Sequence, residues 1–264
     1  MPPPPPDHDG PLVSCVVVTA DRPQLLRRSV RCFNRQRYPN RELVVLDDGQ
    51  ADLSDALREV PAHQLRYTRI EKDPSNVLGA LRNQTLDLAQ GDVIAQWDDD
   101  DWYDAERLRV QVEQLQQGAD ACTLAATLMH LNTPAFLRHP YVGHLRGGVP
   151  GTIVHRRDDA IRYPAQRRAE DSVYLDAWRA RTHVELPDTY AHLFIRTFHG
   201  ANTWEQKHFN RRLRNSVPRT LSYLWYRYVK GDLFEHPKFR LSPAARAAFA
   251  LYLEDSFDLG LLHE

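Results

Sequence analysis

The sequence predicts an α/β fold in which a mainly parallel sheet is sandwiched by helices, followed by a helical C-terminal extension. Between residues 13 and 101, short β-branched runs alternate with amphipathic helical stretches, which is the pattern of βαβ units. Each predicted strand ends where a polar loop begins, as ligand-binding α/β sheets require. A chain of 264 residues is long enough for one large domain with a small appendage.

The first half supplies the predicted parallel strands. We place them at residues 13–19, 42–47, 65–70 and 93–97. A helix begins near Pro23, with Leu26 and Val30 on its apolar face, and a second spans residues 78–89 and stops before Gly91. Polar clusters therefore follow the first, second and fourth strands, at one edge of the sheet.

The second half is predicted to contain helices, further strands and a glycine-bearing loop. We expect helices at 104–117 and 170–178, strands at 152–155 and 191–198, one or two strands within 119–131, and a glycine-bearing loop at 143–151. Residues 204–264 are helical in pattern, with Ser242 and Pro243 capping the last helix. The aromatic stretch 223–228 is predicted to pack onto the core, with an acceptor platform, a lipid-surface contact or an oligomer face as alternatives.

Composition excludes several classes of function. With 34 basic and 35 acidic residues, the chain has no overall field for nucleic acid. No segment approaches the roughly 20 apolar residues of a membrane span. The Pro-rich start, residues 1–11, is predicted to be a disordered tail, and three cysteines without metal spacing indicate reduced thiols and a cytoplasmic protein. Peripheral membrane contact at the inner face and self-association through the C-terminal helices stay open.

The run Asp98, Asp99, Asp100 and Asp101 is the strongest functional signal in the sequence. Four consecutive carboxylates after an apolar strand repel one another, so we expect a cation to offset them. Mg²⁺ or Mn²⁺ fits, because such ions take one or two protein carboxylates and fill their other positions with water and substrate phosphate. A solvated acidic turn is the plain alternative. A calcium loop fits badly, since Tyr103 would stand at its required glycine and Arg109 at its bidentate glutamate.

These motifs, in this order, resemble the inverting family 2 glycosyltransferases with the A-type nucleotide-sugar fold. The resemblance is carried by the strand and turn at 13–23, the segment 36–49 ending in Asp47-Asp48-Gly49, Arg82-Asn83, and the run 96–102. It is close over residues 12–115 and looser up to about residue 203. It implies a nucleotide-binding half at 12–115 and an acceptor-binding half at 116–203. The helical extension at 204–264 lies outside the resemblance.

The resemblance also implies a metal and nucleotide site. Asp100 would be the carboxylate ligand of a divalent cation, and His199 matches a late histidine that completes the metal site in many members. The nucleotide and its ribose would contact Thr19, Arg22, Asp48, Arg82, Asp98 and Asp99. Asp99 and Asp101 offer other registers for the metal ligand, and Ala20 stands where many members carry an aromatic that stacks on uracil. Trp102 and Tyr103 are the candidates for stacking on a sugar.

Glu170 and Asp171 resemble the family's acidic pair, in which the second carboxylate is the catalytic base. Acidic residues are also ordinary at a helix N-terminus. The resemblance implies a metal-dependent inverting enzyme that moves a sugar from a nucleotide-diphosphate donor, with UDP favoured, to a saccharide, lipid-linked or other acceptor. One rival is a nucleotidylyltransferase, although the turn 19–23 lacks the glycine-rich phosphate loop of those enzymes. The other is an inactive sugar-nucleotide-binding scaffold.

Overall fold

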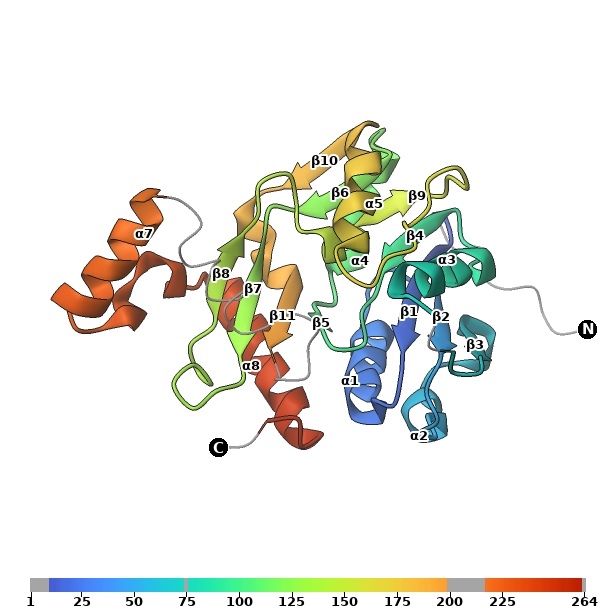
Figure 1. Cartoon of the computed structure of the whole chain (residues 1–264), viewed down its shortest axis with the longest axis horizontal. Coiled ribbons are helices and arrows are strands. Elements are labelled where there is room, and N and C mark those ends of the chain that lie inside the picture. Colours follow the sequence, from blue (N-terminus) through green and yellow to red (C-terminus); the bar gives the residue numbers. More distant parts are fainter. Residues whose placement is uncertain (1–9, 74–75, 199–216, 263–264) are drawn as a thin grey trace, which may run out of the picture.

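The computed structural model describes residues 10–73, 76–198 and 217–262 and contains two sheets (Figure 1). The larger sheet has seven strands in the order β10-β6-β9-β4-β1-β2-β3. In that order they span His183–Leu186, Ala121–Leu124, Val154–Arg156, Val93–Gln96, Val13–Thr19, Arg41–Asp47 and Leu65–Arg69. All pairs are parallel except those of β9, which runs antiparallel to β4 and β6. The predicted α/β fold with a mainly parallel sheet is confirmed.

A smaller sheet of four strands, in the order β5-β11-β7-β8, lies beside the larger one. Its strands span Trp102–Tyr103, Phe194–Phe198, Ala126–Leu131 and Tyr141–His144. The predicted strand pair in 119–131 exists as β6 and β7, but the two belong to different sheets. Strands β5, β8 and β10 were not predicted, because two to four residues are too few to show an alternation.

Helices cover both faces of the larger sheet. The α-helices are α1 (Pro23–Asn34), α2 (Ser54–Leu57), α3 (Leu78–Leu88), α4 (Arg107–Gln116), α5 (Glu170–Arg179), α7 (Val217–Leu224) and α8 (Pro243–Asp258). Shorter turns are η1 (Ala62–Gln64), η2 (Pro150–Thr152), η3 (Asp188–Leu193), the π-helical η4 (Trp225–Val229), η5 (Leu233–Glu235) and η6 (Pro237–Phe239). No helix within the described ranges has the length and apolar character of a membrane span.

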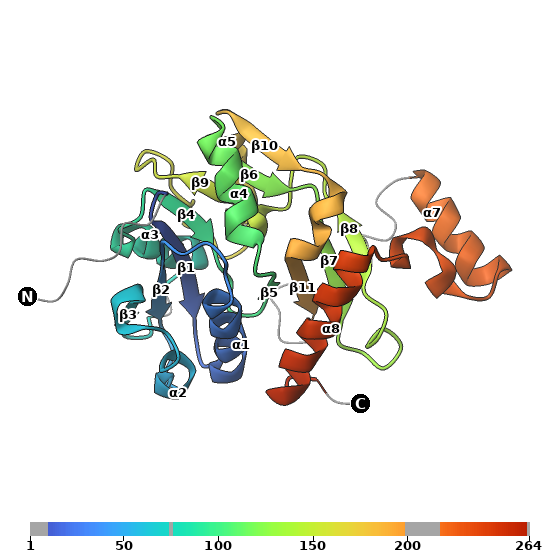
Figure 2. The same cartoon turned by 180° about the vertical axis from the view of Figure 1, so that it is seen from behind.

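The alternation of side chains along the central strands separates two cores. One set of strand residues, including Val17 and Val45, packs with α1, α4 and α8, while the opposite set, including Val16 and Val44, packs with α3 and α5. Figure 2 shows α4 and α8 on the near side, and Figure 1 shows α3 and α5 there. Each layer buries the apolar face that the sequence periodicity indicates.

The two C-terminal helices differ in how they are packed. In α8, Ala248, Phe249 and Tyr252 join the main core, and the hydroxyl of Ser242 accepts a hydrogen bond from the backbone N–H of Ala245 at 3.1 Å, as the capping prediction required. In the 223–228 stretch, Tyr223 packs on a small cluster, but Trp225 and Tyr228 are 53% and 72% exposed. The prediction that this stretch packs onto the core is wrong for those two side chains.

Candidate active site

A cavity of about 810 Å³ opens at the carboxyl ends of β1, β2 and β4. β1 has β4 on one side and β2 on the other, so chain order switches there, which is where α/β sheets bind ligands. One side of the cavity, here called the strand wall, carries Thr19, Arg22, Asp48, Arg82 and the aspartates 98–101. The opposite side, the α5 wall, carries residues 167–171. All residues predicted for the nucleotide, the metal and catalysis that fall in the described ranges therefore line one cavity; His199 lies outside those ranges.

The aspartates of the strand wall alternate between buried and cavity-facing positions. Asp99 is 3% exposed, and its carboxylate accepts a 2.6 Å hydrogen bond from the Thr19 hydroxyl and lies 3.4 Å from the Arg22 guanidinium. Burial, reinforced by the neighbouring Asp100 carboxylate, raises the pKa of Asp99 to about 7. Burial likewise raises the pKa of Asp101 well above its usual range. The side chains of Asp98 and Asp100 keep about a fifth to a quarter of their surface exposed.

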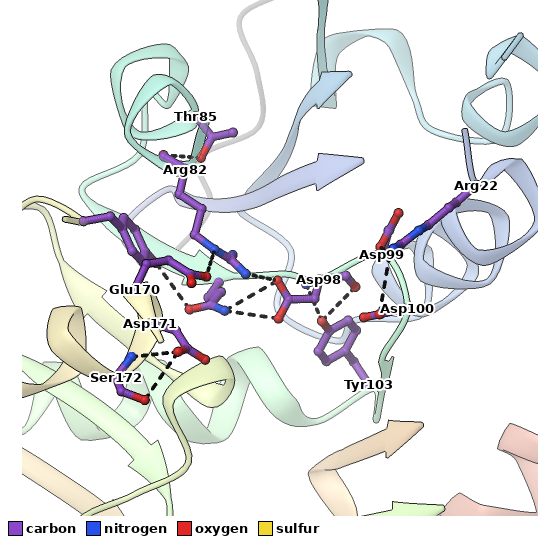
Figure 3. Close-up of polar contacts among 12 residues, drawn as sticks. Arg22, Arg82, Thr85, Asp98, Asp99, Asp100, Tyr103, Glu170, Asp171 and Ser172 are labelled. Carbon is purple, nitrogen blue, oxygen red and sulfur yellow. Dashed lines mark hydrogen bonds and ion pairs between the residues drawn. The ribbon is translucent and has the colours of Figure 1, made fainter. Parts of the chain in front are cut away.

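Arg82 links the two walls (Figure 3). It extends from α3, is 7% exposed, and donates from Nη2 to Asp98 at 2.7 Å and from Nε to Glu170 at 3.2 Å. The amide of Gln96 donates a further hydrogen bond to Asp98 at 3.1 Å. Burial raises the pKa of Glu170 despite the nearby Arg82 cation. Arg82 therefore holds both carboxylates in place; its assignment to the nucleotide stays a prediction.

Asp171 has a different environment from its neighbour Glu170. Glu170 is 3% exposed, whereas Asp171 is half-buried and accepts hydrogen bonds from the backbone N–H and hydroxyl of Ser172 at 2.7 and 3.4 Å. Ala169, which precedes the pair, has a φ of 60°, a conformation uncommon for alanine. The chain thus turns sharply into α5, with Glu170 directed at Arg82 and Asp171 on the cavity side (Figure 3).

Asp47 and Asp48, at the end of β2, have different environments. Asp47 is fully buried and accepts hydrogen bonds from Gly49 N–H, the Tyr67 hydroxyl and Arg69, all at 2.8 Å. Asp48 lines the cavity, and partial burial raises its pKa. Asp47 therefore holds the turn, which leaves Asp48 as the carboxylate able to meet a ligand.

The aspartate run is also supported from behind by α1 and α8. Arg28 of α1 donates to the backbone carbonyl of Asp100 at 2.6 Å and to the Ser256 hydroxyl at 3.0 Å. The Trp102 indole N–H donates to Asp255 of α8 at 2.9 Å. Trp102 and Tyr103 are 0% and 1% exposed, so the prediction that they stack on a sugar is wrong. They fill the core beneath the run instead.

Several cations of the cavity were not predicted as site residues. Arg196 on β11 lines the cavity, and its pKa is raised by the carboxylates of Asp101, Asp171 and the rest of the run, against the lowering effect of burial. Lys72, Arg167 and Arg168 line the cavity as well. A single arginine on a strand does not indicate a functional role, so Arg196 is recognised as a cavity residue only because the structure pairs β11 with β5. The pair Arg167-Arg168 could have been predicted to be part of the site from its position in the sequence beside Glu170.

The donor set fits a hard divalent cation. Carboxylate oxygens are its preferred ligands, and the described residues of the cavity lining include eight Asp or Glu against six Lys or Arg, so negative charge is in excess here. Within the described ranges, no three His, Cys, Asp or Glu side chains are grouped as a metal site. Asp98 and Asp100 would therefore supply one or two ligands, with the remainder from a diphosphate and water.

Comparison with known proteins agrees with this geometry. The sequence model of the family described as Glycosyl transferase family 2 matches residues 14–228. The chain is 36% identical over 110 residues to Escherichia coli WcaA, named as a glycosyl transferase, and 37% identical over 99 residues to the hyaluronan synthase of Pasteurella multocida. These segments cover 41% and 36% of this chain but 39% and 10% of the relatives, so the chain spans less than half of each.

Solved structures share the fold at low identity. A fragment of S. aureus TarS superposes with a TM-score of 0.56 at 18% identity, covering 95% of this chain and 83% of that one. The mannosyltransferase PcManGT from Pyrobaculum calidifontis, solved with GDP-Man and Mn²⁺, gives a TM-score of 0.55 at 15% identity, covering 96% of this chain and 73% of the other. At these identities the likeness shows the fold.

Proposed function

The chain belongs to glycosyl transferase family 2, and from that premise we propose that it transfers a sugar from a nucleotide-diphosphate donor, UDP favoured, to an acceptor hydroxyl with inversion. The observation that carries the proposal is the single cavity with seven predicted ligand-binding residues on one wall and Asp171 on the other. A neighbouring structure solved with UDP-GlcNAc and another with GDP-Man and Mn²⁺ support a nucleotide-sugar donor.

The strand wall would bind the donor. Thr19, Arg22, Asp48, Asp98 and Asp100 all line the cavity. We assign the first three to the nucleoside and the last two to its diphosphate. A divalent cation held by Asp100 would offset the charge that develops on the leaving diphosphate. Because Thr19, Arg22 and Arg82 already fix the aspartates, little reorganisation accompanies binding.

The α5 wall would bind the acceptor and take its proton. In-line displacement requires the acceptor oxygen to attack the anomeric carbon opposite the departing diphosphate, so the base belongs on the opposite wall. Asp171 takes the hydroxyl proton as the new carbon–oxygen bond forms and the bond to the diphosphate breaks. Glu170 is held by Arg82, so we assign it to positioning. The charge of Arg196 interacts with Asp171 and with the aspartate run, and Arg196 would stabilise the negative charge of the donor.

Other features of the proposal concern extent, acceptor and location. We propose a catalytic unit spanning residues 12–203, supplemented by α8, whose Asp255 accepts a hydrogen bond from Trp102, directly after the aspartate run. The name hyaluronan synthase among the relatives favours a polysaccharide or other glycoconjugate product. Cys15, Cys32 and Cys122 are buried and unpaired, which supports a reducing, cytoplasmic location.

A donor screen tests the function. The purified chain is incubated with UDP- and GDP-sugars, with Mn²⁺ or with chelator, and free nucleotide is measured together with the anomeric configuration of any transferred sugar. Metal-dependent release of nucleoside diphosphate with inverted product supports the proposal. Release of pyrophosphate from a nucleoside triphosphate and a sugar phosphate would identify a nucleotidylyltransferase. Nucleotide binding with no turnover of any donor would identify a scaffold.

A further inference from the structure

The helix α7 and the turn η4 carry an apolar face that the fold leaves exposed. Leu221, Leu224, Trp225, Tyr228 and Val229, here called the α7 face, are 40% to 72% exposed. Their spacing is i, i+3, i+4, i+7 and i+8, so they form one continuous stripe. Exposed apolar patches of this kind mark interaction sites. Figures 1 and 2 both show α7 projecting at the end of the molecule opposite β3.

Residues within 239–253, which follow α7 and η4 in the chain, line a cavity of about 540 Å³ together with Arg138 and Pro140. This cavity combines apolar side chains with arginines and is here called the arginine groove. Phe239, Phe249 and Leu253 contribute its apolar surface, while Arg138, Arg240 and Arg246 are its charged lining residues. Within the described part of the chain, its lining includes no aspartate or glutamate. An apolar surface bordered by arginines is complementary to an anionic amphiphile.

The sequence of this region carries the opposite charge balance to the rest of the chain. Residues 217–250 contain six Lys or Arg and two Asp or Glu, a net of +4, although the whole chain has a net charge of -1. Charge asymmetry within one chain indicates an electrostatic partner for the biased segment. A positive surface next to an exposed tryptophan and tyrosine has the composition of a bilayer-binding surface, where aromatic rings lie at the headgroup level.

We propose that the α7 face and the arginine groove together bind the surface of an anionic lipid bilayer, so that the protein attaches peripherally to it. A second copy of the chain is a poor occupant, because a two-fold interface would place two segments of net +4 against each other. RNA would match the charge and could stack on Trp225 and Tyr228. It offers no hydrocarbon environment to Leu221, Leu224 and Val229. The proposal does not rest on the glycosyltransferase function, since it concerns a different surface.

Vesicle co-sedimentation of the full chain tests the proposal. The vesicles are phosphatidylcholine alone, or phosphatidylcholine with 30% phosphatidylglycerol. We expect binding to the anionic vesicles that weakens in high salt, because surface charges are screened. Replacing Lys230 and Arg240 together by glutamine should lower the partition coefficient about 30-fold, since each basic residue near an anionic surface contributes about a factor of five.

A second pair of variants tests the apolar part. Trp225→Ala with Tyr228→Ala should weaken binding about tenfold or more, because two aromatic side chains no longer enter the interface. The matched controls are Val173→Ser, which removes an exposed apolar residue of α5, and Arg58→Gln, which removes an exposed cation beyond α2. Both should bind like the unaltered chain. Thermal melting of every variant shows that it is folded.

Four outcomes overturn the proposal. The first is no binding of the unaltered chain to anionic vesicles, and the second is equal binding to neutral vesicles that neither variant pair changes. The third is a concentration-dependent dimer in solution that Trp225→Ala with Tyr228→Ala disrupts, because the α7 face would then belong to a second copy. Tight RNA binding that displaces the vesicles and is lost in the same variants would reassign the surface to nucleic acid.

Discussion

The strand wall and the α5 wall of the cavity are built in different ways. The strand wall holds its carboxylates with partners from distant parts of the chain: Thr19 and Arg22 on Asp99, Arg82 on Asp98, and Arg28 on the backbone of Asp100. On the α5 wall, Arg167 and Arg168 are exposed, and Asp171 is half-buried with Ser172 beside it. The strand wall is buried and cross-linked, whereas the α5 wall is open except at Glu170, which is buried and held by Arg82.

This difference matches what each wall would do. Binding a diphosphate through a cation requires several fixed charges, and fixing them before the ligand arrives lowers the reorganisation cost. A general base must instead remain within reach of a mobile acceptor hydroxyl. The comparison predicts that changes on the strand wall alter binding and stability, whereas a change at Asp171 alters the rate.

The largest effect is expected at Asp171. Asp171→Asn keeps the size of the side chain and removes the base, so single-turnover transfer should fall by about 10² to 10⁴-fold. Donor affinity and metal dependence should stay near those of the unaltered enzyme. Asp176→Asn, an exposed carboxylate on the same helix, is the control and should leave the rate unchanged. A near-normal rate in Asp171→Asn would move the base to another carboxylate and remove the distinction between the walls.

The contacts that α8 makes behind the strand wall should contribute to the free energy of unfolding. Asp255 is 5% exposed and accepts hydrogen bonds from Trp102 and Arg35, so Asp255→Ala leaves a buried indole N–H and a half-buried guanidinium without their acceptor. We expect the free energy of unfolding in urea to fall by about 3 kcal/mol. The control is Asp258→Ala, whose carboxylate pairs with Arg31 but is 61% exposed, with an expected loss of about 0.5 kcal/mol. Equal losses in the two variants would contradict the proposed support.

The α5 wall should respond to acid through the histidine beneath it. The ring of His155 stacks on Trp178 at 4.2 Å and lies 2.9 Å from the Tyr174 hydroxyl, and burial lowers its pKa to about 4. Below pH 6.5 the unfolded chain binds a proton at this histidine that the folded protein does not. The neutral, buried His155 therefore contributes fully to the free energy of unfolding above pH 6.5. This contribution is lost as the pH falls toward 4, and the loss is about 3 kcal/mol.

The measurement is the free energy of unfolding at pH 7 and at pH 4.5, in the unaltered chain and in His155→Gln. The variant should lose less stability on acidification than the unaltered chain does. His130, whose pKa is also lowered to about 4 by burial, adds a parallel loss in both proteins and cancels in the difference. Identical pH dependences in the two proteins would show that His155 has the same pKa in the folded protein as in the unfolded chain.

The smallest expected effect is a difference in UDP binding between variants of two neighbouring aspartates of the strand wall. Asp100→Asn should weaken Mn²⁺-dependent binding of UDP about tenfold to a hundredfold in calorimetry, because one charged ligand of a hard cation is lost. Asp99→Asn should change it by less than about threefold at pH 6.5, since a carboxyl with a pKa of about 7 is already largely protonated there. The reverse order would make Asp99 the metal ligand.

Much of the fold followed from local patterns. The predicted strand 13–19 is β1, and the predicted helix starting at Pro23 is α1, because β-branched runs and an apolar stripe after an N-terminal proline are local signals. The smaller sheet was not predicted as a sheet. Its strand β5 has two residues and pairs with β11, which lies some ninety residues later in the chain. No window of sequence holds both partners.

The candidate site was predictable where it follows strand ends and motifs. Asp48, Asp100 and Asp171 were predicted and line one cavity, although their chemical roles stay predictions. Arg196 was missed, because an arginine on a strand has no local mark of function. The stacking role given to Trp102 and Tyr103 was wrong, because the partners that bury them lie far along the chain. Trp102 contacts Tyr252 and Asp255 of α8, and Tyr103 packs on Phe194 of β11.

The sequence by itself determined the α/β class, the positions of the first strands along the chain and the acidic residues that line the cavity, because these depend on spacing along a few residues. Only the tertiary structure decided which carboxylates are buried and which face the cavity. That choice depends on contacts such as Arg82 with Glu170 and Trp102 with Asp255, 88 and 153 residues apart. Burial and pairing are properties of the packed chain, and they set the pKa and the accessibility of each group.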